Sequence, residues 1–450
     1  MTKRIALVAT AAVFVVSFAM TAIASGRSTR HRHTVVRARA ASSQPDQVIQ
    51  WNQELQKVLV APGAQPGSIH PTRTMAITQI AVYDAVNGIV GHRDPLLVDV
   101  GRAPGASPDA AAASAAHTVL DALLPSQSAS IDAFFQSSLS QIGSGESVDR
   151  GVVYGEQVAN AVLAARANDG ATVTPPVFTP LTGPGEYQLT PPAFPPAGFT
   201  QTRNVTPFVL DSASQFRAPE PPALTSNQYA TDFNEVKSLG RKTSTTRTAD
   251  QTAIGTFWGA APIWVVWNQV ADQAGVAFGN SLAQNARLFA ALDTTLADSA
   301  IALYDSKYTY HRWRPITAIT AADQGNLNTV ADSTWVPLAN TANDPSYPGA
   351  HADFSQAAAS VLQDFFHTDA FTFSLSNAGV GITRSFTSFS AASNEASNSR
   401  IFAGQHFRYD ENAGQAQGAA VAEFVVEHAF GRDGGRENGH HDHPDEGGGR

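Results

Sequence analysis

The feature that most restricts the fold is a proline-rich stretch between Thr172 and Thr225, which holds 12 of the chain's 26 prolines. Proline fixes φ and removes a backbone donor, so this stretch excludes long helices and favours extended, polyproline-like chain. Phenylalanine and tyrosine side chains are interleaved with the prolines, and we expect them to hold the segment against the rest of the protein. Residues 172–226 are therefore predicted to be an irregular connection packed on the core.

Both flanks of this connection carry apolar residues at helical spacing. An N-terminal helical module is predicted over 47–171, with helices at 74–90, 109–123 and 149–165. A C-terminal helical module is predicted over 227–430, with helices at 228–239, 247–257, 264–273, 285–307, 352–366 and 412–430. Alternating strand patterns are scarce, so the predicted fold class is all-α.

The N-terminus has the pattern of an export signal. Lys3 and Arg4 precede an apolar run that ends in Ala-Ile-Ala before Ser25, which predicts a signal peptide over residues 1–24 and export of the protein. The alternative is an uncleaved N-terminal membrane anchor, because about 20 apolar residues can span a bilayer. Residues 25–46 are predicted to be a basic, flexible segment. No later stretch is apolar enough to span, so the mature chain should have no stable membrane span.

Composition excludes several classes of function. The chain has 38 acidic and 29 basic side chains and a formal net charge of −9, which argues against a general nucleic-acid binder. It has no cysteine, so histidines, carboxylates, cations and hydroxyls must carry any chemistry. Residues 431–450 form a Gly-, His- and acid-rich tail that is predicted to be disordered. The sequence leaves the oligomeric state undecided: a homo-oligomer is possible, but no heptad repeat indicates a specific one.

The first candidate motif pairs two cations in the segment KYTYHRWRP. Lys307 and Arg314 are seven positions apart, which on a helix is two turns, and Pro315 is expected to end that helix. Two cations on one face would form a clamp for an oxyanion. The alternative is an amphipathic helix whose positive ends are solvated.

The second candidate motif is a small-residue turn that opens a helix. Gly349 and Ala350 would present backbone N–H groups and the positive end of the helix dipole to an anion. His351 would lie in the first turn, where it could move a proton. Taken alone, a histidine at a helix start is more often structural.

The third candidate motif is SRIFAGQHFRYD, which supplies a third cation, Arg400, and a His-Asp pair. His406 and Asp410 are four positions apart, so the carboxylate can hold one imidazole nitrogen and leave the other as a lone pair for a metal centre or a phosphorus atom. A purely structural pair is the alternative. The order of all three motifs in one chain is improbable by chance, at about one in ten thousand when each specified residue has a frequency of roughly 5%.

These motifs resemble those of the vanadium-dependent haloperoxidases and the related type 2 phosphatidic acid phosphatase superfamily. The flanking segments at 206–210, 215–226 and 296–319 also resemble bacterial members, and the resemblance covers about residues 70–430. It implies an all-helical fold built around four-helix bundles, with one site that binds vanadate or phosphate.

The resemblance also implies roles for the cations. Lys307, Arg314 and Arg400 would neutralise the equatorial oxygens of the bound oxyanion, and His406 would be the axial ligand of vanadium. Vanadate and the phosphoryl-transfer transition state share a trigonal bipyramidal shape with concentrated negative charge, so three fixed cations suit both.

Two chemistries are therefore open, with His351 as the acid-base residue and Asp410 orienting His406. The first choice is a vanadate-dependent peroxidase that uses hydrogen peroxide to oxidise a halide or another small donor. The alternative is a soluble acid phosphatase, in which His406 attacks the phosphorus of a phosphomonoester and forms a phosphohistidine. A third possibility is a non-catalytic oxyanion-binding protein.

The chain departs from the family pattern near the site. Gly349 replaces the usual serine, and losing one hydrogen bond to a charged group, about 1.5–3 kcal/mol, would weaken oxyanion affinity by up to about a hundredfold. Seven residues before His351, characterised haloperoxidases carry an aromatic side chain or histidine near the halide. Here the residue is Asp344, which would repel a halide if it points inward. Tyr304 stands where many members have tryptophan.

Overall fold

The computed structural model describes residues 45–91, 93–321 and 325–431. The predicted signal peptide, nearly all of the basic segment and nearly all of the C-terminal tail lie outside the described residues. The described part contains 13 α-helices, two short 3-10 helices and one two-stranded sheet, which confirms the all-α class. Within this part, no helix is both long and apolar enough to cross a membrane.

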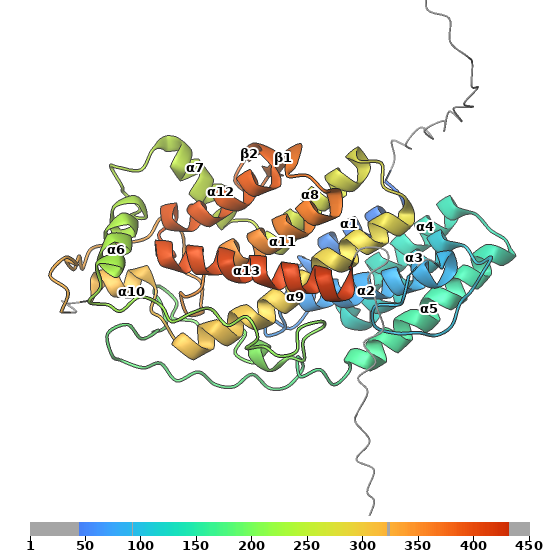
Figure 1. Cartoon of the computed structure of the whole chain (residues 1–450), viewed down its shortest axis with the longest axis horizontal. Helices are drawn as coiled ribbons and strands as arrows, with labels where there is room; N and C mark the ends of the chain where they lie inside the picture. The colour runs from blue at the N-terminus through green and yellow to red at the C-terminus, as the bar shows by residue number, and fades with distance from the viewer. Residues whose placement is uncertain (1–44, 92, 322–324, 432–450) are drawn as a thin grey trace, which may run out of the picture. The chain divides into compact units, whose positions relative to one another are not determined.

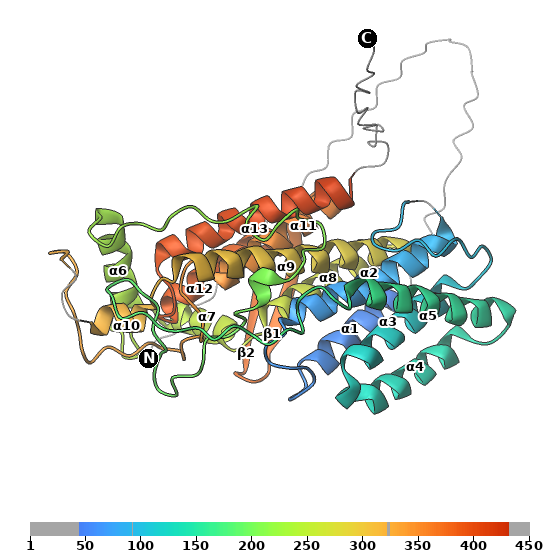
Figure 2. The same cartoon turned by 90° about the horizontal axis from the view of Figure 1, so that it is seen from below.

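Five α-helices precede the proline-rich connection (Figures 1 and 2). They are α1 (Gln47–Leu59), α2 (Pro71–Val90), α3 (Pro108–Leu123), α4 (Ser128–Ile142) and α5 (Glu146–Arg166), with the 3-10 turn η1 (Pro125–Gln127) before α4. The alanine-rich face of α3 packs against α2 and α5. Gly155 of α5 permits this contact, since a Cβ there would lie 2.3 Å from the Ala111 carbonyl oxygen.

The remaining helices form the part that carries the predicted site. They are α6 (Asn227–Leu239), α7 (Ala249–Gly259), α8 (Ile263–Ala277), α9 (Leu282–Tyr310), α10 (Pro315–Thr320), α11 (Ala350–Phe366), α12 (Phe389–Phe402) and α13 (Arg408–Ala429). Figure 1 shows α9, α11 and α13 running side by side, and each packs against the other two. A capping box at Ser281 starts α9, and every residue from Leu288 to Tyr308 is buried. The helix that carries Lys307 is therefore enclosed on all sides.

Close packing of α11 on α13 fixes the position of the second motif. Cβ atoms at Gly414 and Gly418 would lie 2.3 Å and 2.1 Å from the backbone oxygens of Gly349 and Asp353, respectively. Only glycine permits this approach, and it places the start of α11 directly against the start of α13.

The proline-rich connection has one short helix among its described residues, η2 (Thr202–Asn204), and runs along α9. Asp298 of α9 accepts three consecutive backbone N–H groups, from Phe208, Val209 and Leu210, at 2.7–3.0 Å. Arg203 donates to the Tyr308 carbonyl oxygen at 2.8 Å. The connection is thus bonded to the helix that carries Lys307.

The structure also contains elements that the sequence did not single out. The hairpin of β1 (Ala370–Asn377) and β2 (Ile382–Ser388) is antiparallel, with Phe373 opposite Phe386 on its buried side. Helices α10 and α12 are likewise absent from the prediction, whereas α1 and α4 fall inside the predicted N-terminal helical module without having been named individually. Helix α12 is rich in Ser and Asn, which are poor helix formers, and it is held by the Ser388 cap and by packing against α7 and α11.

Candidate oxyanion site

Lys307 and Arg314 meet, but not on one helical face as predicted. Helix α9 ends at Tyr310, His311 takes a left-handed conformation with φ of 47°, and Arg314 is extended at the N-cap of α10. Pro315 begins α10 and does not end α9, because proline suits the first turn of a helix. The prediction of a continuous helix through Arg314 is wrong, and a turn brings the two cations together.

A carboxylate lies between these cations. The Lys307 ammonium is 3.1 Å from Asp344 Oδ1, and Arg314 Nη2 pairs with the same oxygen. Lys307 also donates to the backbone oxygens of Pro345, at 2.5 Å, and Ser346, at 3.2 Å. Burial lowers the pKa of Lys307 to about 8, although Asp344 acts in the opposite direction. Burial alone would raise the pKa of Asp344, but Lys307 and Arg314 together hold it below its ordinary value.

His406 is held as the third motif predicted. Its Nδ1 is 3.1 Å from Asp410 Oδ2, and that carboxylate also accepts the Ser346 hydroxyl and the Phe407 N–H. Nδ1–H therefore donates to Asp410, and Nε2 keeps its lone pair, which accepts from Arg314 Nη1 at 2.8 Å. Burial, followed by the nearby cations, lowers the pKa of His406 well below its ordinary value, so the imidazole is neutral.

Arg400, near the end of α12, brings unused donors to the site. Its Nη2 pairs with Gln405 Oε1, whereas its Nε and Nη1 are buried and have no hydrogen-bond partner among the described residues. Burial lowers the pKa of Arg400 to about 10, which still leaves the guanidinium charged at neutral pH. Buried, charged donors without acceptors are costly, so they favour binding of an anion.

The start of α11 supplies one of the two predicted backbone donors. Gly349 N–H donates to the Asp410 carbonyl oxygen at 2.9 Å. This N–H is therefore already in use, and the prediction that it donates to the oxyanion is wrong. Ala350 is the first residue of α11, where the N–H group has no partner within the helix and lies at the positive end of the dipole.

His351, the next residue of α11, is half-buried and is 3.2 Å from the Trp258 carbonyl oxygen through Nε2. Burial and then the Arg400 charge lower the pKa of His351 well below its ordinary value. Among the described residues, no hydrogen bond joins His351 to the other predicted site residues. The cations of the site affect His351 electrostatically, and His351 follows Ala350 directly in α11.

Three residues that sequence reasoning missed complete the site. Ser346 holds the Asp410 carboxylate, and Gln405 accepts from Arg314 through its backbone oxygen and from Arg400 through its side chain. Glu411 is buried, its Oε1 is 3.6 Å from His406 Nδ1, and neither carboxyl oxygen has a hydrogen-bond partner in the described part of the chain. Burial raises the pKa of Glu411 to about 8. Their nearness to the motifs in sequence was the one available signal.

The residues present fit an oxyanion better than a bare metal cation. Across the described ranges, no group of three or more His, Cys, Asp or Glu side chains could hold a metal ion. In contrast, Arg400 offers two unpartnered donors, and His406 presents a neutral nitrogen beside Arg314. Vanadate or phosphate would accept hydrogen bonds here from Arg400 and from the Ala350 N–H, and the His406 Nε2 lone pair could hold a vanadium or phosphorus centre after it leaves Arg314.

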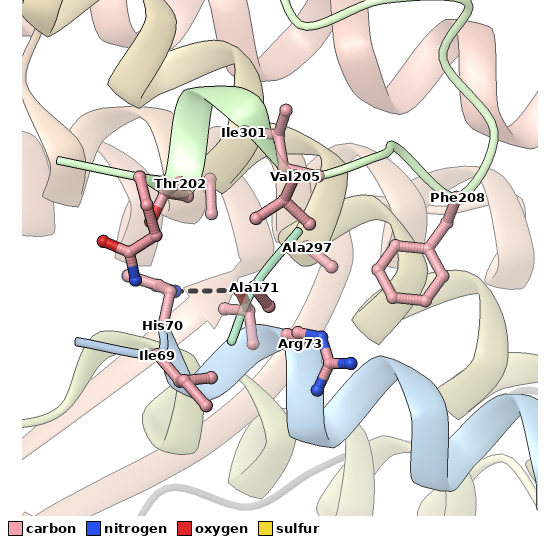
Figure 3. A pocket seen from close by; sticks show the side chains of 12 residues that line it. Ile69, His70, Arg73, Ala171, Thr202, Val205, Phe208, Ala297 and Ile301 are labelled. Atoms are coloured by element: carbon pink, nitrogen blue, oxygen red, sulfur yellow. Dashed lines mark hydrogen bonds between the residues drawn. The ribbon is translucent and has the colours of Figure 1, made fainter. Parts of the chain in front are cut away.

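A small cavity lies beside this site, because its wall residue His70 packs 5.6 Å from the Tyr304 ring, whose hydroxyl is 3.4 Å from Asp344 Oδ2. Figure 3 shows it between the start of α2, the connection and α9, with His70, Thr202 and Ile301 on its walls. Its volume is about 20 Å³, room for about one water molecule, and no predicted site residue lines it. Burial lowers the pKa of His70 to about 3, so this imidazole is neutral.

The fold is a helical one with a buried cluster of cations whose chemistry suits an oxyanion, and comparisons with known proteins relate it to the vanadium-dependent haloperoxidases. The family described as VCPO second helical-bundle domain matches residues 287–432. Vanadium chloroperoxidase of Curvularia inaequalis is 27% identical over 183 residues, covering 33% of this chain but only 29% of that enzyme. The chain is therefore similar to less than a third of that enzyme's length.

Solved structures extend the similarity over most of the chain. A bacterial vanadium-dependent iodoperoxidase has a TM-score of 0.73 and 26% identity, and the match covers 85% of this chain and 96% of that one. A holo-type bacterial vanadium-dependent chloroperoxidase has a TM-score of 0.66 at 15% identity, covering 86% and 98%, which shows the shared fold. The matching family model, the curated relative and the solved structures together support the resemblance of this chain to the superfamily of vanadium-dependent haloperoxidases.

Proposed function

We propose that this chain is a vanadate-dependent peroxidase of the haloperoxidase type, which uses hydrogen peroxide to oxidise a halide or another small donor. One observation carries the proposal: a neutral His406 presents Nε2 beside Arg314, in a site where Arg400 keeps two unpartnered donors. The similarity to an iodoperoxidase over 85% of the chain supports peroxidase over phosphatase chemistry.

Each residue of the site has a distinct task in this proposal. Bound vanadate supplies a Lewis-acidic centre that activates hydrogen peroxide. Arg314 and Arg400 stabilise the negative charge of the oxyanion, and His406 is the nitrogen ligand that Asp410 holds in one tautomer. His351, neutral and only half-buried, accepts and returns protons at the side of the site that solvent reaches.

The experiment measures halide oxidation by the purified protein with hydrogen peroxide and bromide or iodide, before and after addition of orthovanadate. Hydrolysis of p-nitrophenyl phosphate is followed in parallel. Vanadate-dependent halide oxidation is the expected result. Phosphate ester hydrolysis that vanadate suppresses, without halide oxidation, would reassign the chain to the acid phosphatases. Silence in both assays, with stoichiometric vanadate uptake, would indicate a binding protein.

Two variants test the assigned roles. His351→Ala is expected to abolish turnover while vanadate still binds, because the imidazole moves protons and does not ligate. His406→Ala is expected to abolish both turnover and tight vanadate binding, because it removes the imidazole nitrogen that would hold the vanadium. Unchanged turnover in either variant contradicts the corresponding role.

Export remains part of the proposal and depends on residues 1–24 alone. N-terminal sequencing of the mature protein from its producing cells is expected to begin at Ser25. A chain that begins at its first residue and fractionates with membranes would support the anchored alternative.

A further inference from the structure

Asp344 occupies the position between two cations of the site, although it belongs to none of the three motifs. Its side chain is nearly buried, and Oδ1 is shared by the Lys307 ammonium and the Arg314 guanidinium. The backbone oxygen of Asp344 also accepts from Arg314 Nε at 2.8 Å. The hydroxyl of Tyr304, on α9, donates to the other carboxylate oxygen, Oδ2, at 3.4 Å.

These contacts leave few donors for an external anion. An ammonium group has three N–H donors, and those of Lys307 have three acceptors: Asp344 Oδ1 and two backbone oxygens. Arg314 donates from Nε to the backbone oxygen of Asp344 and from Nη2 to its carboxylate. Its Nη1 donates to the Gln405 backbone oxygen and to His406 Nε2. Arg400 alone of the three cations keeps two donors without a partner in the described structure.

The charges lead to the same conclusion. Asp344 is ionised, because Lys307 and Arg314 hold its pKa below the ordinary value in spite of burial. An oxyanion that reaches Lys307 and Arg314 must either displace this carboxylate or lie beside it. Both cost free energy, the first by breaking charge-assisted hydrogen bonds and the second by repulsion between like charges.

We propose that Asp344 is an internal counter-ion, which stabilises the two cations when no oxyanion is bound and competes with the oxyanion for them. Asp344 therefore sets the affinity of the site. This inference rests on the proposed function, because it requires that the site bind an oxyanion.

The test measures the affinity for inorganic phosphate by titration calorimetry in the natural chain and in Asp344→Asn. Asparagine keeps the shape but removes the competing charge, so phosphate is expected to bind at least tenfold more tightly. Asp344→Glu retains a carboxylate and is expected to bind no more tightly than the natural chain. Arg400→Ala is expected to lose phosphate binding in either background.

Two buried cations without a counter-ion can prevent folding, so melting temperature is the second measurement. Phosphate is expected to raise the melting temperature of Asp344→Asn more than that of the natural chain, or to be required for its folding. Asp169→Asn is the matched control, because Asp169 is a buried carboxylate between Arg73, at 2.7 Å, and Arg166, at 3.0 Å, outside the site.

The outcomes separate the two proposals. If the natural chain binds phosphate and Asp344→Asn binds it equally or more weakly, the inference about Asp344 is wrong while the oxyanion site stands. If phosphate stabilises Asp169→Asn as much as Asp344→Asn, or fails to support folding of Asp344→Asn, the inference is also wrong. If neither the natural chain nor Asp344→Asn binds phosphate or vanadate, the proposed function fails, and the inference with it.

Discussion

Replacing Gly349 by serine tests why this chain has glycine where the haloperoxidases that it resembles usually have serine. The backbone of Gly349, with φ of −78° and ψ of 117°, suits any residue, so the substitution causes no backbone strain. A Cβ atom at this position would nevertheless lie 2.2 Å from Glu411 Oε1, 2.7 Å from Cδ and 3.2 Å from Oε2. The carboxyl of Glu411 thus fills the space that the serine side chain needs.

The magnitude follows from how far Glu411 can move. Glu411 is fully buried, so its carboxyl can yield only by pushing on packed neighbours, and overpacking of this kind costs about 1–3 kcal/mol. Gly349→Ser is expected to lose that much unfolding free energy. Glu411→Ala removes the obstacle, so the double variant should be more stable than the sum of the single effects predicts, by about 1 kcal/mol or more.

The assay is urea unfolding of the natural chain, both single variants and the double variant, with equal m-values required for comparison. Gly349→Ser/Glu411→Gln is the control, because glutamine keeps the volume of glutamate and should keep the clash. In the Gly349→Ser/Glu411→Ala variant, the new hydroxyl is also expected to tighten phosphate binding roughly tenfold to a hundredfold. A serine variant as stable as the natural chain, or strict additivity in the double variant, would refute the steric argument.

Three further predictions concern the core. Burial raises the pKa of Asp293 to about 8, well above its unfolded value, so the folded state binds the extra proton and stability falls as pH rises toward 8. Between pH 5 and pH 8 the natural chain is expected to lose about 4 kcal/mol of unfolding free energy that Asp293→Asn does not lose, as measured by urea unfolding. Parallel pH profiles of unfolding free energy in the two proteins would contradict this. Gly418→Ala is expected to cost about 3 kcal/mol by calorimetry, since its Cβ would lie 2.1 Å from the Asp353 oxygen, whereas Gly67→Ala, with no atom within 4 Å, should be near neutral. Asp298→Asn weakens three bonds to the connection, so it should lose about 2 kcal/mol or more and speed tryptic cleavage within residues 172–226, and an unchanged cleavage rate would argue against this anchoring.

Much of the fold was predictable because its signals are local. The predicted segment 109–123 lies within one residue of α3, since a serine cap, a following proline and an alanine-rich run are all adjacent in sequence. The start of α11 next to His351 was predictable for the same reason. Helix α12 was not, because its Ser- and Asn-rich sequence has little helical preference and its packing against other elements compensates.

Residue types and spacing also determined much of the site. The i, i+4 spacing of His406 and Asp410 was enough to predict their contact, because residues at this spacing lie about one helical turn apart. Three cations, two histidines and a helix start were enough to predict an oxyanion site, which stays a prediction, and to indicate the resemblance that the comparisons support. What spacing could not determine was the course of the backbone after Tyr310, where a left-handed residue ends α9 before Arg314.

Only the tertiary structure decided which donors and which spaces are already in use. Asp344 takes up Lys307 and Arg314, and Glu411 takes up the space beside Gly349, through contacts between residues 30 to 62 positions apart. Such contacts depend on how α9, α11 and α13 pack. The space that a glycine leaves at the start of one helix is filled by a side chain from another, as Glu411 of α13 does beside Gly349. Chemistry that resides in single residues can therefore be inferred from sequence, whereas competition for one charge or one small volume is settled only when the helices are assembled.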